Sequence, residues 1–176
     1  MPEPLIHFAL PFALLTARGM DPKKAALISL IAVLPDLDVL IHVHRSYTHS
    51  LLIPMAVLII ALLKYRNRWL ILAALSYASH PILDFVTYYT PILWPIYPGS
   101  LWLKATLDIH IASLPTTIKL NIELLEQPAS EALRPFKELE ATAATGQGFL
   151  IALALMLTPF IVRRRLKAIT QQQPQV

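Results

Sequence analysis

Acidic and histidine side chains interrupt segments of this sequence that are otherwise apolar. Two carboxylates lie in the run Leu34-Pro35-Asp36-Leu37-Asp38, and an imidazole follows in Ser46-Tyr47-Thr48-His49-Ser50. Ionisable groups in apolar surroundings are costly unless they are paired or bound to a metal. These residue types therefore indicate a site for a divalent cation.

A further pair of polar groups lies in the run His80-Pro81-Ile82-Leu83-Asp84. The i, i+4 spacing places an imidazole and a carboxylate one turn apart on the same face of a helix. A single histidine on an apolar face is more often a hydrogen-bonded core residue than a ligand, so the prediction depends on the whole constellation. Its members are His7, Asp36, Asp38, His49, His80 and Asp84.

The ligands must be nitrogen and oxygen atoms because the chain has no cysteine. Mixed His and Asp ligands suit zinc, with manganese or iron as alternatives, and an incomplete shell leaves a position for water. Metal-bound water can attack an ester or phosphoester near neutral pH. Whichever of Asp36 and Asp38 does not bind the ion is expected to be the general base, and we assign that catalytic role to Asp38.

Arg45 is the second residue to which we assign a catalytic role. Its planar guanidinium binds phosphate in two places and would hold an anionic oxygen, although anchoring to lipid headgroups is an equally good interpretation. Three further histidines are weaker candidates, since each also fits an ordinary interfacial position: His42, His44 and His110.

The composition indicates which kind of fold must position these residues. The 176 residues are 56% hydrophobic and 15% charged, whereas roughly a quarter of a globular domain is charged. Five apolar segments occur: Leu5–Ala17, Ala25–Val43, Leu51–Leu63, Trp69–Tyr88 and Phe149–Val162. A full span needs about 20 residues, so the first, third and fifth segments are short and could instead be core helices of a soluble protein.

The distribution of basic residues favours the membrane interpretation. With five spans, all three basic groups fall on one side, which the positive-inside rule makes cytoplasmic. Because these residues sit at the ends of apolar runs and not in a stripe with aromatics, we expect no nucleic-acid partner. The groups are Arg18, Lys23 and Lys24, then Lys64, Arg66 and Arg68, then Arg163, Arg164, Arg165 and Lys167.

We therefore predict an all-α integral membrane protein with about five transmembrane helices, the second of them kinked at Pro35. Residues 1–170 form one helical membrane domain, and residues 171–176 a disordered tail. The N-terminus and the His/Asp cluster lie at the external face of the cell membrane, together with an extracytoplasmic segment over about residues 89–147. The C-terminus is cytoplasmic.

The external segment has structure of its own. It opens with prolines and with aromatic rings that suit the headgroup layer. Apolar and polar residues alternate from Ile118 to Leu124, which predicts a strand, one arm of a short β-hairpin. The stretch Glu131–Thr142 is typical of a surface helix.

At these residues the sequence resembles the YdjM-type family of predicted membrane-bound metal-dependent hydrolases, which looks distantly similar to zinc-dependent phospholipase C. The resemblance implies a first metal site from Asp36 or Asp38 with His49, His80 and Asp84, and a second in which His7 joins an ion bridged by Asp84. The matching pieces are His7, Leu34-Pro35-Asp36-Leu37-Asp38, His44-Arg45, Thr48-His49-Ser50, Ser79-His80 with Asp84, and Thr90 to Pro95.

We expect a membrane-bound metal-dependent hydrolase that acts on a lipid or lipid-linked phosphoester through metal-activated water. Membrane lipid and the lipid substrate are then its partners, and the oligomeric state is unknown. The alternative is a non-catalytic membrane protein with a structural metal or polar site, which would be closed where a catalytic site is open. An ion transporter using Asp36 and Asp38 ranks last, because the His-rich loop lies at one face.

Overall fold

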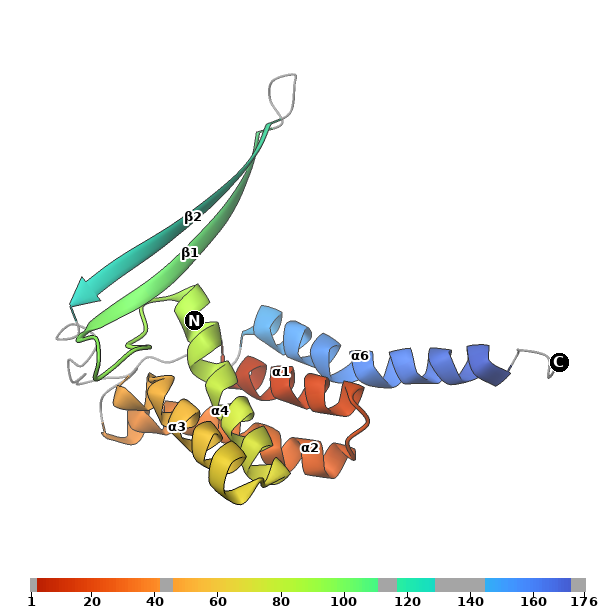
Figure 1. Cartoon of the computed structure of the whole chain (residues 1–176). Coiled ribbons are helices and arrows are strands. Elements are labelled where there is room, and N and C mark those ends of the chain that lie inside the picture. Colours follow the sequence, from red (N-terminus) through yellow and green to blue (C-terminus); the bar gives the residue numbers. More distant parts are fainter. Residues whose placement is uncertain (1–2, 42–45, 111–116, 129–144, 172–176) are drawn as a thin grey trace.

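The computed structural model describes residues 3–41, 46–110, 117–128 and 145–171, which form a group of helices with a long two-stranded hairpin (Figure 1). The predicted helical character and the predicted hairpin are confirmed, although the hairpin is longer than expected. The helices are α1 (Pro4–Ala17), α2 (Pro22–Ser29), α3 (Leu52–Ile60), α4 (Arg68–Thr87) and α6 (Gly146–Gln171). Two 3₁₀ segments, η1 (Leu30–Ile41) and η2 (Tyr47–His49), and one π segment, η3 (Ala61–Tyr65), complete the helical part.

Two of these helices could cross a membrane by length and composition: α4, and α6 over Gly146–Arg164. Within the described ranges, α1 and the stretch Leu52–Tyr65 are apolar but shorter. Only 28% of the apolar window of α4 and 17% of that of α6 is buried inside the protein. A core helix of a soluble protein would hide most of such a surface, whereas the described chain leaves most of it uncovered on both helices.

The interior has the opposite character to the exterior. Large apolar side chains on the outer faces of the helices are exposed, among them Leu63, Leu75 and Ile82. The largest fully buried side chains are instead His7, His49 and His80. Ionisable groups that face inward while apolar groups face outward are the expected pattern for a protein whose solvent is lipid.

The second predicted span is not one helix. The α-helix ends at Ser29, and the chain continues as 3₁₀ helix through Pro35 and both acidic residues. Proline lacks an N–H and clashes with the carbonyl four residues earlier, so it disfavours continued α-helix. The carbonyls of Ala32 and Pro35 are freed by this change, and they accept hydrogen bonds from His80 and Thr48.

A separate turn, η2, comes before the third predicted span. His49 precedes the third apolar segment and lies outside its helix. The first helical N–H of α3 donates to the hydroxyl of Ser50, at 3.2 Å. Ser46 and Thr48 therefore do not cap α3. The backbone N–H of Ser46 and the hydroxyl of Thr48 instead lie within hydrogen-bond distance of Asp38.

Helices α1 and α6 pack against each other, with their first turns adjacent. The buried carboxylate of Glu3 accepts a hydrogen bond from the backbone N–H of Thr145, at 2.7 Å, just before α6 begins. A carboxylate at this end also compensates the helix dipole. Gly148 permits the approach, because a Cβ there would overlap the Glu3 carboxylate. This contact fixes the helix that carries His7.

Strands β1 (Gly99–His110) and β2 (Thr117–Pro128) form an antiparallel pair that extends away from the helices (Figure 1). The predicted strand Ile118–Leu124 is confirmed within β2. Backbone hydrogen bonds between Thr90 and Leu101 attach the base of the hairpin to the segment after α4. The predicted helix Glu131–Thr142 and the tail from residue 172 lie outside the described residues.

Candidate metal centre

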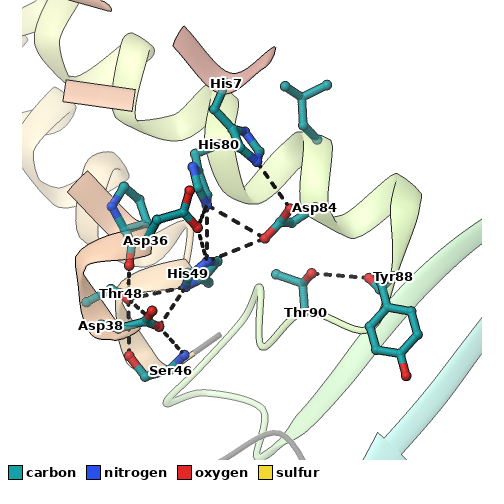
Figure 2. Close-up of polar contacts among 12 residues, drawn as sticks. His7, Asp36, Asp38, Ser46, Thr48, His49, His80, Asp84, Tyr88 and Thr90 are labelled. Carbon is teal, nitrogen blue, oxygen red and sulfur yellow. Dashed lines mark hydrogen bonds and ion pairs between the residues drawn. The ribbon is translucent and has the colours of Figure 1, made fainter. Parts of the chain in front are cut away.

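Two imidazoles meet at the centre of the cluster, with 3.1 Å between Nε2 of His49 and Nε2 of His80 (Figure 2). Nδ1 of His80 lies 2.7 Å from the carbonyl oxygen of Ala32. A carbonyl oxygen only accepts, so the proton of a neutral His80 ring is on Nδ1 and its Nε2 carries a lone pair. The hydrogen bond between His80 of α4 and Ala32 of η1 thus directs the basic Nε2 of His80 toward His49.

His49 is oriented in the same way by different partners. Its Nδ1 lies 3.3 Å from Oδ2 of Asp38 and 3.2 Å from the hydroxyl oxygen of Thr48. A carboxylate beside Nδ1 places the ring proton there and raises the basicity of the opposite nitrogen. Two lone pairs then face each other at contact distance, which is stable only with a cation between them: a proton on His49 or a metal ion.

Two carboxylates complete the surroundings of the facing nitrogens. Oδ1 of Asp36 lies 3.4 Å from Nε2 of His80 and 3.8 Å from Nε2 of His49. Oδ2 of Asp84 lies 3.4 Å from Nε2 of His49 and 3.7 Å from that of His80. Zinc binds nitrogen and oxygen ligands at about 2.0–2.1 Å, so a tetrahedral site needs ligand atoms about 3.3 Å apart. Asp36, His49 and His80 therefore form one group of ligand atoms that could hold a divalent ion, with Oδ2 of Asp84 next to the two imidazoles.

The electrostatics of the cluster also favour a cation. Burial of the His49 ring acts to lower its pKa, but the hydrogen bonds to Asp36 and Asp38 and the charge of Asp84 outweigh burial, so the pKa is raised. His49 lies in η2, outside the two candidate spans. The same carboxylates that attract a proton to this ring would attract a metal ion in its place.

His7 lies on the other side of His80 and stacks on it, with ring centroids 3.7 Å apart. Its Nε2 is 3.4 Å from Oδ1 of Asp84, and these three residues form a second group with ligand atoms close to one another. Asp84 thus directs one carboxylate oxygen to His7 and the other to His49 (Figure 2). Nδ1 of His7 is buried and has no hydrogen-bond partner within the described ranges.

The structure brings together residues from four segments that are far apart in the sequence: His7 from α1, Asp36 from η1, His49 from η2, and His80 and Asp84 from α4. Asp38 belongs to neither group of mutually close ligand atoms. Its Oδ2 faces Nδ1 of His49 and accepts a hydrogen bond from the backbone N–H of Ser46, at 2.8 Å. Three other predicted residues, His42, His44 and Arg45, lie outside the described residues.

Hydroxyl groups around the cluster have roles that the sequence analysis missed. The Thr48 hydroxyl lies within hydrogen-bond distance of the Pro35 carbonyl and of Asp38 Oδ2, at 3.1 and 3.3 Å. The Tyr77 hydroxyl donates to the backbone carbonyl of Thr48, at 2.7 Å. The sequence signal for these roles is the concentration of hydroxyls in Ser46-Tyr47-Thr48-His49-Ser50.

The cluster is closed to solvent on most sides. The side chains of His49 and His80 are 0% exposed and that of Asp84 is 3% exposed, whereas that of Asp36 is 19% exposed. Asp36 is therefore the least buried of these four side chains.

Comparison with known proteins identifies the family. The chain matches the YdjM inner membrane protein family over residues 3–168, which is almost the whole sequence. The chain belongs to the YdjM inner membrane protein family. Membership makes this a membrane protein, which accounts for the apolar exterior of α4 and α6.

The YdjM description gives a location and no reaction. No curated protein and no solved structure matches the chain. The chemistry of this YdjM protein must therefore be argued from the cluster itself.

Proposed function

We propose that this YdjM family member is a multi-pass membrane protein that hydrolyses a lipid or lipid-linked phosphoester with a bound divalent ion, zinc first. Its N-terminus and cluster would lie on the external side and its C-terminus in the cytoplasm. The observation that carries the proposal is the pair of Nε2 atoms of His49 and His80, which face each other at 3.1 Å beside Asp36 and Asp84.

The residues of the chain have distinct roles in this proposal. When bound, a divalent ion would supply the Lewis acidity that activates water for attack on a phosphoester. Nδ1 of His80, bonded to Ala32, and Nδ1 of His49, beside Asp38, hold the two rings so that their Nε2 atoms converge. Asp36 is the less buried of the two carboxylates beside the facing nitrogens, so an incoming substrate would approach on its side.

Two expectations about catalysis remain proposals. Asp38 would be the general base if it does not bind the ion. The position of its Oδ2 beside Nδ1 of His49 favours a different role, which is to orient that ring. Arg45 would hold a phosphate oxygen, as its guanidinium geometry allows. The lipid nature of the substrate is supported by the membrane location of the family and by the position of the cluster near the carboxyl-terminal end of α4.

A second function is favoured by one observation. The cluster has two imidazoles and two carboxylates around the facing nitrogen atoms, from His49, His80, Asp36 and Asp84, which is as many protein ligands as a tetrahedral shell takes. Closed four-ligand shells are typical of structural zinc sites. In that case the ion would join η1, η2 and α4 and catalyse nothing.

The test is hydrolysis by the full-length protein, purified in detergent, loaded with zinc or manganese, and reconstituted in vesicles that contain a phospholipid mixture or a polyprenyl phosphate. Release of headgroup or phosphate is followed for the wild type, for His80→Ala and for Asp108→Asn, a control on the exposed hairpin. Release that is lost only in His80→Ala supports the hydrolase. Release that persists in His80→Ala contradicts it, and bound metal without any release from either lipid favours the structural site.

A further inference from the structure

The β-hairpin has one face made almost wholly of aliphatic residues. Residues directly opposite in an antiparallel pair project to the same face. The register sets a row of four such pairs side by side: Leu103 with Leu124, Ala105 with Ile122, Leu107 with Leu120, and Ile109 with Ile118. The row is not covered by the rest of the described chain, because Leu107, Ile118, Leu120, Ile122 and Leu124 are each more than 60% exposed.

Beyond the Trp102–Leu125 pair near its base, the other face of the hairpin is polar and electrically balanced. Lys104 lies opposite Glu123, and Asp108 lies opposite Lys119. Asn121 donates a hydrogen bond to Asp108, at 2.9 Å. Each of these two lysines therefore faces an acidic residue, so the ribbon offers no basic patch of its own for anionic headgroups.

The base of the hairpin carries an aromatic cluster next to the end of α4. The rings of Tyr88, Tyr89 and Trp102 contact one another, with centroids 5.3 to 5.7 Å apart. Tyrosine and tryptophan concentrate at the level where a membrane helix leaves the hydrocarbon. The hairpin thus begins at the depth where a ribbon could lie along the bilayer surface.

We propose that the aliphatic face of the hairpin lies on the surface of the bilayer that holds the helices, inserted at the boundary between headgroups and acyl chains. An exposed aliphatic row of this length on a soluble surface would be an aggregation hazard. A protein partner would be expected to meet aromatic, methionine or arginine residues at the centre of the face, and this row has none. Because the hairpin follows α4, a candidate membrane span, the bilayer is the nearest apolar phase.

The native chain has no cysteine, so single cysteines can place a spin label at one chosen position. We would label Leu120→Cys on the aliphatic face and Asn121→Cys on the polar face of the full-length protein, reconstituted in phosphatidylcholine vesicles. Collision rates with oxygen, which concentrates in the bilayer, and with a water-soluble nickel chelate are measured for each label. The expected ratio of oxygen to nickel collisions is several-fold higher at residue 120 than at residue 121, at both low and high salt.

Two other occupants of the face would give different results. Spin–spin broadening at residue 120 that grows with the protein-to-lipid ratio would show a second copy on the face and overturn the proposal. Equal nickel collision rates at residues 120 and 121 would show a face open to water, and low rates with both reagents at residue 120 would show a face covered by this chain itself. Either result overturns the proposal.

A third label tests whether the contact between the hairpin and the bilayer depends on aliphatic side chains. Leu124→Cys is examined with Ile118→Lys and Ile122→Lys present together, and with Thr106→Lys as the matched control on the polar face. The double lysine variant is expected to lower the oxygen-to-nickel ratio at residue 124 to the value found at residue 121, and the control to leave it high. An unchanged ratio in the double variant would contradict apolar docking.

Discussion

Nε2 of His49 and Nε2 of His80 lie 3.1 Å apart while Nδ1 of each ring faces an acceptor on its far side. Rotation of either ring would break that outer contact, so the two basic nitrogens stay opposed. A cation between them removes the repulsion, and the carboxylates of Asp36 and Asp84 add to its stabilisation.

Metal content is expected to depend on the two rings. Wild-type protein purified in detergent should carry close to one zinc or manganese ion per chain between the facing imidazoles, and His49→Ala/His80→Ala should carry almost none. Elemental analysis of the monodisperse fraction measures this. Asp108→Asn on the hairpin serves as the control and should keep the wild-type content. Equal metal content in the double variant and the wild type would rule out this centre.

Asp38→Asn separates orientation from proton transfer. If Asp38 orients His49 through Nδ1, the variant should lose about 10- to 100-fold in metal affinity, as outer carboxylates of metal-bound histidines do. Competition with a fluorescent chelator measures the affinity. A variant that binds metal normally but has lost turnover would instead establish Asp38 as the base.

Tyr77→Phe should weaken the cluster indirectly. The hydroxyl of Tyr77 donates to the carbonyl of Thr48, the residue before His49, and its loss leaves that carbonyl without this donor. We expect a cost of about 1 kcal/mol in the stability of the folded state. Thermal unfolding in detergent measures it, with Tyr65→Phe, an exposed tyrosine, as the control. A shift of the same size in both variants would mean that the bond to Thr48 is unimportant.

Stability should respond to pH in opposite ways without and with metal. The pKa of His49 is raised above its ordinary value of 6.5. In the metal-free protein the protonated ring therefore contributes stability below pH 6.5, and this contribution is lost as the pH rises through the folded-state pKa. Metal binding needs the neutral ring, so the additional stability from zinc should grow over the same range. Unfolding temperatures are measured across this pH range with a chelator, for the metal-free protein, and without one, for the zinc-bound protein.

Two glycines at the start of α6 provide a matched pair. Gly148→Ala would force the Glu3 carboxylate away from Thr145, whereas a Cβ at Gly146 meets no atom within 4 Å. We expect Gly148→Ala to lower the free energy of unfolding by about 1 kcal/mol, a typical cost of overpacking. Gly146→Ala should be neutral or slightly stabilising. Thermal unfolding of the two variants under one condition decides, and equal midpoints would contradict the packing described for Glu3.

The sequence predicted the regular parts of the fold well. Helix α1 begins one residue before the predicted segment, and α4 is displaced by one residue from it. Helix α6 continues to Gln171, past the predicted end at Val162, because a basic run ends a hydrophobic segment without ending a helix. Strand β1 was missed although Leu101 to Ile109 alternate as clearly as β2 does.

The cluster was predicted in its members but not in its internal arrangement. The distinction between Asp36 and Asp38 depends on the 3₁₀ path of η1, and hydropathy carries no signal for that path. The hydrogen bond from Ser46 N–H to Asp38 is a tertiary contact across eight positions, which a local pattern cannot indicate. Side-chain orientation was thus set by backbone geometry that the sequence analysis could not predict.

The hydrogen bond between Glu3 and Thr145 joins the first described residue to the start of the last described segment. All five residues of the two ligand groups precede the hairpin, whereas Thr145 follows it. During biosynthesis the ligands therefore emerge from the ribosome before the helix that supports α1 exists. A chain truncated between Thr87 and Thr145 would keep every member of the cluster and lack α6, which packs against α1. All the ligands are therefore synthesised before the helix that holds α1 in place.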